Sequence, residues 1–168
     1  MKLIAINTAR YTRGFTLIEL IITILVVSIL MTIAIPSFQN TIQQNRFSTQ
    51  SNELIGALNL ARSEAIRRGE SVTVTPNGGS WTNGWVVATT APVTTLRSFP
   101  ALATNFTYAG GPTSYTYLPS GFKDNTNVDL YSLCNSSVTG ETGRQVRISA
   151  SGRPRIVLNV DGTYFNPC

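Results

Sequence analysis

Four arginines near the C-terminus carry the most distinctive chemistry of the sequence. They are Arg144, Arg147, Arg153 and Arg155. A guanidinium presents its N–H donors as a rigid planar fork that fits a phosphate group. Contacts of this kind supply most of the affinity of proteins that bind DNA without reading its sequence. The cluster therefore indicates a phosphate-binding patch. A solvated arginine face, or arginines that contact neighbouring proteins, would use the same residue type.

The alternation of side chains predicts where these arginines point. In the first of two predicted strands the apolar neighbours of Arg147 would face the core, so Arg147 points outward. In the second strand the same alternation places Arg153 and Arg155 outside. If residues 150–152 form the turn, Arg147 lies directly opposite Arg155. Two like charges in that position repel each other, and no acid lies between Arg144 and Arg155. Glu141 and Asp161 are the nearby acids that could relieve the repulsion, and a two-residue turn would break the alignment.

The sequence lacks the residues that most enzymes need. It contains no histidine, which is the commonest general base and the commonest transition-metal ligand in proteins. Outside the first 14 residues Lys123 is the only lysine, so a Ser–Lys dyad would have to use it. We therefore expect no catalytic residues, no metal site, no cofactor and no enzymatic activity. A membrane-anchored enzyme would need a catalytic base that the sequence does not offer.

Two cysteines, Cys134 and Cys168, are far apart in the sequence. In an exported chain such a pair predicts a disulfide, and the alternative is two unpaired thiols. A bridge that closes a loop of this length would stabilise the fold by roughly 3–4 kcal/mol on the chain-entropy model.

Composition also indicates export. Only 12% of the 168 residues are charged, whereas about a quarter is usual for a soluble domain. The net charge is +5, but Lys2, Arg10 and Arg13 precede the first apolar stretch with no acid among them. The rest of the chain is therefore only mildly basic.

The stretch from Phe15 to Ile35 is apolar apart from one charge, Glu19. About 20 such residues span a bilayer as a helix, and basic residues in front of it place the N-terminus in the cytoplasm. A cleaved signal peptide would have a shorter apolar core of ~7–15 residues. A plain membrane anchor leaves Glu19 unexplained, because a carboxylate in the apolar region costs about 2.5–3.5 kcal/mol.

Residues 14–20, Gly-Phe-Thr-Leu-Ile-Glu-Leu, resemble the prepilin peptidase motif of type IV pilins and type II secretion pseudopilins. The resemblance implies cleavage between Gly14 and Phe15 and N-methylation of the new N-terminal Phe15. It also implies that Glu19 neutralises the amine of Phe15, in its own or a neighbouring subunit. Pro36 stands where pilins have a proline that kinks or locally melts the first helix.

Beyond the apolar stretch the pattern changes from helix to strands. Leu54, Leu58, Ala61 and Ala65 recur at helical spacing, and Gly69 is a natural helix terminator. We expect one long, interrupted helix from about residue 15 to residue 68. The candidate strands that follow are residues 71–75, 81–88, 94–99, 105–108, 114–118, 128–133, 145–149 and 153–160. Trp81, Trp85 and the tyrosines could stack on nucleic-acid bases, but aromatics in a β-rich head more often form its core.

Residues 52–65, 130–134, 143–148 and 151–155 resemble the minor-pilin family that contains FimT, FimU and GspH. The resemblance implies an α+β, type IV pilin-like fold, in which a long N-terminal helix packs on two small antiparallel sheets. In the FimT branch a C-terminal Gly-Arg-x-Arg motif is associated with DNA capture during natural transformation. Residues 152–155, Gly-Arg-Pro-Arg, match that motif.

These observations predict a leader peptide at residues 1–14, a membrane helix at 15–36 and a periplasmic or extracellular head at 37–168. Within the head we expect the amphipathic helix to end at about residue 68 and the β-rich part to cover residues 71–168. The predicted function is that of a minor pilin that assembles or primes a type IV pilus and binds double-stranded DNA for uptake, whatever its sequence. The alternatives are a GspH-like secretion pseudopilin and a minor pilin with a purely structural role. The predicted partners are the prepilin peptidase, other major and minor pilins and the inner membrane.

Overall fold

The computed structural model describes residues 14–136 and 143–157 of the chain. The chain divides into two compact units, Met1–Ile42 and Gln43–Cys168. Cys168, the second cysteine of the predicted disulfide, lies outside the described residues.

A single helix, α1 (Leu17–Arg68), begins in the first unit and ends in the second. The prediction of one long helix that ends at Arg68 is confirmed. The predicted interruption is wrong, because Pro36 lies inside a continuous helix. Proline removes a single N–H donor, so the helix loses one backbone hydrogen bond at this position and retains its neighbours.

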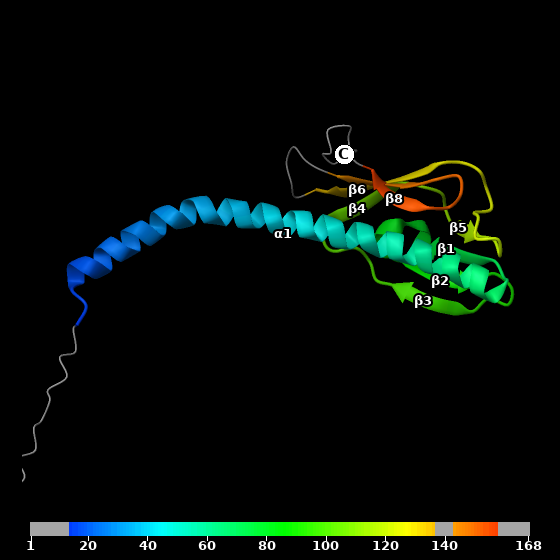
Figure 1. The fold of residues 1–168 in the computed structure, drawn as a ribbon, viewed down its shortest axis with the longest axis horizontal. Helices are drawn as coiled ribbons and strands as arrows, with labels where there is room; N and C mark the ends of the chain where they lie inside the picture. The colour runs from blue at the N-terminus through cyan, green and yellow to red at the C-terminus, as the bar shows by residue number, and fades with distance from the viewer. Residues whose placement is uncertain (1–13, 137–142, 158–168) are drawn as a thin grey trace, which may run out of the picture. The chain divides into compact units, whose positions relative to one another are not determined.

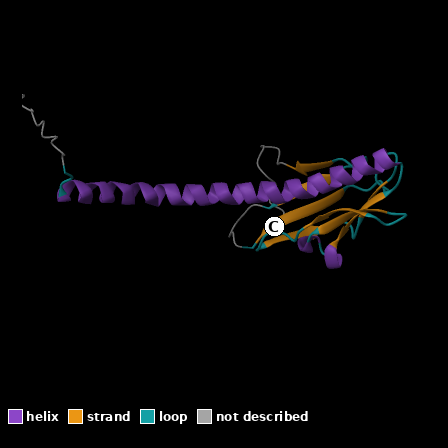
Figure 2. Cartoon of the chain, turned by 90° about the horizontal axis from the view of Figure 1, so that it is seen from below, coloured by secondary structure: helices purple, strands orange, loops and turns teal. Residues whose placement is uncertain are grey.

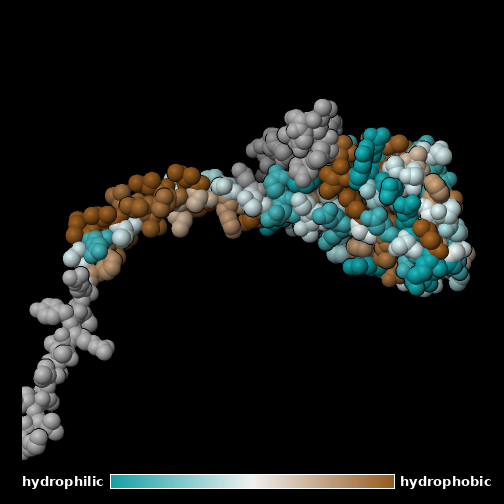
Figure 3. All heavy atoms as spheres, viewed as in Figure 1, coloured by the Kyte–Doolittle hydropathy of each residue, from teal (hydrophilic) through white to brown (hydrophobic). Residues whose placement is uncertain are grey.

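In the first unit α1 exposes many large apolar side chains, and the face of it seen in Figure 3 is mostly brown. By length and composition this helix could cross a membrane. The hydroxyls of Thr23, Ser28 and Thr32 donate to backbone carbonyls of Leu20, Ile24 and Ile29, one turn earlier. These polar groups are therefore satisfied within the helix, which lowers the cost of apolar surroundings.

The strands of the second unit form two four-stranded antiparallel sheets, as predicted (Figure 1). The first has the order β3-β2-β1-β5 and consists of β1 (Val72–Pro76), β2 (Trp85–Thr89), β3 (Thr95–Phe99) and β5 (Tyr115–Tyr117). The second has the order β4-β6-β7-β8 and consists of β4 (Phe106–Gly110), β6 (Asp129–Asn135), β7 (Arg144–Ile148) and β8 (Pro154–Val157).

Two short 3-10 helices, η1 (Asn77–Gly79) and η2 (Trp81–Asn83), lie between β1 and β2. The predicted strand at residues 81–88 therefore starts too early, because β2 begins only at Trp85. Gly84 explains the boundary. Its φ of 82° lies in a region that a β-strand does not use, and the chain turns there before it enters β2.

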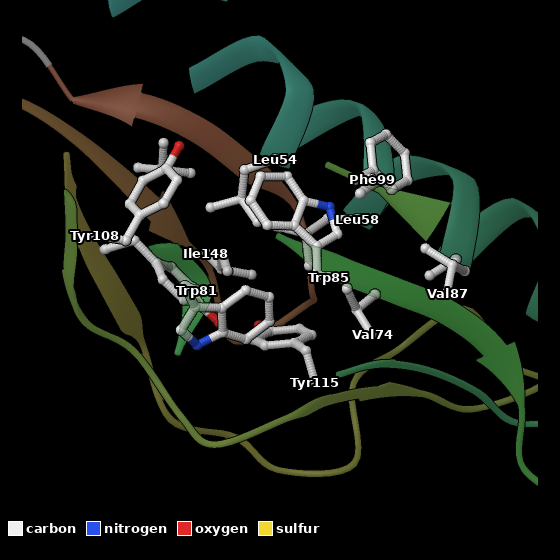
Figure 4. Close-up of a cluster of buried hydrophobic side chains, with 14 of the residues drawn as sticks. Leu54, Leu58, Val74, Trp81, Trp85, Val87, Phe99, Tyr108, Tyr115 and Ile148 are labelled. Atoms are coloured by element: carbon white, nitrogen blue, oxygen red, sulfur yellow. The ribbon is translucent and has the colours of Figure 1, made fainter. Parts of the chain in front are cut away.

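Figure 2 shows the C-terminal part of α1 lying along the strands, and Figure 4 shows a cluster of the buried side chains of the core. Leu54 and Leu58 of α1 are fully buried, as are the alanines that continue their stripe. Trp81 packs edge-on against Tyr131, with ring centres 5.1 Å apart, and Trp85 stacks on Phe99. Both tryptophans are therefore core residues, as predicted.

Four buried tyrosines make the stability of this unit sensitive to high pH. They are Tyr108, Tyr115, Tyr117 and Tyr131. Burial raises the pKa of each phenol well above its usual value, because the phenolate is poorly solvated there. In the unfolded chain the same phenols ionise at about pH 10. The free energy of unfolding should thus be unaffected by these groups below about pH 10 and fall as the pH rises further.

Denaturant midpoints of the full-length protein in neutral detergent, measured across this range, test the prediction. The tyrosinate absorbance of these four residues should appear together with unfolding. Ionisation of these tyrosines at about pH 10 in a protein that stays folded would contradict it.

Candidate functional site

The predicted arginine surface is built on the hairpin of β7 and β8. Residue pairing places Arg147 directly opposite Arg155. The turn is closed by two backbone hydrogen bonds, from Ser149 N–H to the Arg153 carbonyl and from Gly152 N–H to the Ser149 carbonyl. The predicted three-residue turn and the predicted opposition of the two arginines are both confirmed.

Gly152 fixes the position of this turn. Its φ is +79°, a conformation that favours glycine, and an added Cβ would lie 2.7 Å from Cε1 of Tyr117. The hydroxyl of Tyr117 donates a buried 2.7 Å hydrogen bond to the Gly152 carbonyl. The glycine of the Gly-Arg-Pro-Arg segment therefore anchors the turn on β5, directly before Arg153.

Three of the four predicted arginines are available to a ligand. Arg153 and Arg155 are exposed, and Arg147 is half-buried. Within the described part of the chain, no side-chain hydrogen bond or ion pair holds any of the three. We call Arg147, Arg153 and Arg155 the arginine cluster.

The outer face of the second sheet carries no acid among the described residues. Strand pairing and alternating burial place these residues on it: Thr107, Ala109, Leu130, Ser132, Cys134, Gln145, Arg147, Arg155 and Val157. Asp129 of β6 belongs to the opposite face, where its Oδ2 lies 2.6 Å from the buried Nζ of Lys123. The positive charge of the arginine cluster is therefore not neutralised by the described part of its own sheet.

The prediction that Arg144 shares this exposed surface is wrong. Arg144 is only 3% exposed, and its Nη2 donates to Oε1 of Gln44 on α1 over 2.9 Å. The reason is strand alternation, since β7 begins at Arg144 and this residue shares the inward face with Val146 and Ile148. Arg144 thus ties the sheet to the helix.

The residues of the predicted processing motif lie at the start of the described chain. Gly14 and Phe15 are exposed and precede α1, and Glu19 lies in its first turn. The Glu19 backbone N–H donates to Oγ1 of Thr16 over 3.2 Å, which satisfies one of the free donors at the helix start. The roles of Gly14, Phe15, Glu19 and Pro36 in processing and assembly stay predictions.

Cys134 lies on β6 opposite Thr107 of β4. Because Cys168 is outside the described residues, their pairing stays a prediction. In the described ranges, 14–136 and 143–157, no cluster of His, Cys, Asp and Glu could hold a metal ion.

Comparison with known families identifies the fold. The model described as "Type II transport protein GspH" matches residues 50–152, which is more than half of the chain. The chain belongs to the GspH family. A second model, the prokaryotic N-terminal methylation motif, matches residues 9–35. The GspH family consists of structural subunits, so this chain is a minor pilin or pseudopilin of a type IV pilus or a type II secretion system and is not an enzyme.

Solved structures support the same fold. The type IV minor pilin FimU of Pseudomonas aeruginosa superposes with a TM-score of 0.59 at 22% identity, over 68% of this chain and 90% of FimU. The minor pseudopilin EpsH of the Vibrio cholerae type 2 secretion system superposes with a TM-score of 0.52 at 15% identity, over 66% of this chain and 94% of EpsH. No curated protein sequence matches the chain significantly.

The two family matches also bear on processing and location. The methylation motif implies processing by a prepilin peptidase, and membership of the GspH family implies other pilins as partners. The motif and the apolar N-terminal part of α1 are together consistent with an inner-membrane anchor.

Replacement of Gly152 by alanine tests the anchoring of the arginine turn. Gly69 offers a matched control, because its φ is +67° but an added Cβ would meet nothing within 4 Å. We expect Gly69→Ala to lower the free energy of unfolding by about 1–2 kcal/mol, the cost of a left-handed residue with a side chain. Gly152→Ala should cost more, since its methyl group also collides with Tyr117. Equal losses in chemical denaturation of the two full-length variants would contradict this role for Gly152.

Proposed function

We propose that this GspH-family protein is a minor pilin of a type IV pilus that binds double-stranded DNA for uptake in natural transformation. The observation that carries the proposal is the arginine cluster, in which Arg153 and Arg155 are exposed and Arg147 is half-buried, at a sheet face with no acid among its described residues. As a minor pilin, the protein would assemble or prime the filament.

The geometry of the arginine cluster suits successive phosphates. Arg147 and Arg155 are direct cross-strand neighbours, so their Cβ atoms lie about 5 Å apart. Arg153 is two residues from Arg155, a distance of about 6.6 Å along an extended chain. A polyanion that lies across the hairpin would neutralise all three side chains and remove the repulsion between them.

Duplex DNA fits this surface better than single-stranded DNA. Proteins that hold single strands use exposed aromatic rings on which bases stack. Among the described residues of the outer sheet face there is no aromatic ring, and both tryptophans are buried in the core. The contacts would therefore be to phosphates, independent of base sequence and strongly weakened by salt.

The processing steps of the proposal rest on the resemblance of residues 14–20 to prepilins. Cleavage after Gly14 would remove the leader, residues 1–14, and leave an N-methylated Phe15. Glu19 would then neutralise the amine of Phe15 in its own or a neighbouring subunit. The membrane segment would comprise residues 15–36 and the periplasmic head residues 37–168. The mature protein would reach the cell surface within the pilus.

A second candidate function is that of a type II secretion pseudopilin whose partners are proteins alone. The description of the matching family model and the superposition of EpsH favour it. A minor pilin with a purely structural role is the remaining alternative. Neighbouring genes for pilus assembly or for secretion would separate the pilus from the secretion system.

Removal of the exposed arginine charges tests DNA binding. We expect the Arg153→Gln, Arg155→Gln double variant of the full-length protein to bind duplex DNA more weakly, by a similar factor for different base sequences. The slope of log K against log salt concentration should become shallower by about 2, one for each lost phosphate contact. Titration of labelled duplexes over a salt series measures both quantities.

The control for this experiment is the Arg67→Gln, Arg68→Gln variant. It also removes two positive charges, but from the end of α1, where both arginines already pair with Glu64. Wild-type affinity in the Arg153, Arg155 variant, or an equal loss in the control, would rule out the arginine cluster as the DNA site.

A further inference from the structure

A groove of about 440 Å³ lies between α1 and the edge strand β3, and no step of the proposed function uses it. Thr49, Asn52, Glu53 and Gly56 of α1 form one wall. Arg97 and Phe99 of β3 form the other.

The helix wall is a single polar stripe. Its four residues are spaced i, i+3, i+4 and i+7, so they project from one side of α1. Gly56 stands out among them because glycine in a helix interior is less favourable than alanine. It is exposed, and an added Cβ would meet no atom within 4 Å. Packing within the chain therefore does not require a glycine here. What the missing side chain provides is bare helix backbone that another molecule can approach closely.

The two walls carry opposite charges that do not pair with each other. Glu53 is half-buried, and in the described part of the chain it has no ion pair or side-chain hydrogen bond. The Arg97 guanidinium lies 4.8 Å from the centre of the Phe99 ring. Stacking of this kind occupies the face of the guanidinium and leaves the N–H groups at its edge free to donate. The groove therefore offers one anionic acceptor and one cationic fork.

We propose that this groove receives a protruding segment of a different pilin-family subunit. That segment would place a basic side chain against Glu53 and an acidic side chain against Arg97. The inference rests on the proposed function in one respect, namely that the chain assembles with other pilins.

Charge and shape favour this occupant over the alternatives. Glu53 repels a polyanion, so the groove does not extend the DNA surface. If two copies of this chain met groove to groove, both grooves would stay empty, because both surfaces are concave. A protruding segment of another surface would fill the space. Opposite charges on the two walls fix the direction of such a segment, because reversal would place like charges together.

Site-specific photo-crosslinking in cells that make the full-length protein tests the inference. A photoreactive residue replaces Asn52 in the groove, and the control carries it at Asn59, which is exposed on α1 but does not line the groove. We expect position 52 to give a covalent adduct with another protein that has a prepilin-type N-terminus, and several-fold less of it at position 59. Mass spectrometry of the adduct identifies the partner.

Two further substitutions separate recognition from folding. Glu53→Arg reverses the charge of the helix wall and should abolish the adduct. Gly56→Leu fills space that is empty in the free protein, so it should preserve the fold and still reduce the adduct several-fold. An unchanged adduct in both variants would overturn the assignment.

The crosslinking result and the presence of the chain in filaments together separate failure of the groove inference from failure of the proposed function. If the chain is present in sheared filaments but position 52 gives no adduct, or only an adduct with a second copy of this chain, the groove inference fails and the proposed function stands. If the chain is absent from filaments and no pilin is captured, both fail.

Discussion

The burial of one stripe of α1 is the interaction on which the rest of the head depends. Leu54, Leu58 and Ala61 are fully buried between the helix and the sheets. Because this stripe fixes which side of each sheet faces inward, it also decides which side chains remain outside. Within the first unit the same helix exposes its large apolar side chains and has no such buried stripe.

The inward and outward faces of the second sheet show how one residue type serves two purposes. Arg144 is drawn into the interior and binds Gln44 of α1, so it contributes to structure. Arg147 and Arg155 lie on the opposite face of the same hairpin, where no described acid neutralises them. Gly152 holds the turn between the strands against Tyr117. The surface proposed for DNA therefore results from core packing on its other side.

Much of this arrangement could be predicted from local patterns. Period-two alternation predicted that Arg147 and Arg155 face outward, and a three-residue turn between the strands predicted that they oppose each other. Helical spacing predicted the buried stripe. The same alternation places Arg144 inward with Val146 and Ile148, and the prediction failed to apply it to this residue. What no local pattern shows is the partner of the buried guanidinium, because Gln44 lies 100 residues earlier in the chain. The groove could not be predicted at all, since its walls come from α1 and β3, more than 40 residues apart.

The match of residues 9–35 to the N-terminal methylation motif implies that α1 anchors a processed pilin subunit. Mass spectrometry of the N-terminal peptide of the native protein, recovered from membranes and from sheared filaments, tests this claim most directly. We expect a chain that begins with N-methylated Phe15. A mature chain that begins at Met1, or one cleaved after the apolar segment and released from the membrane, would contradict it.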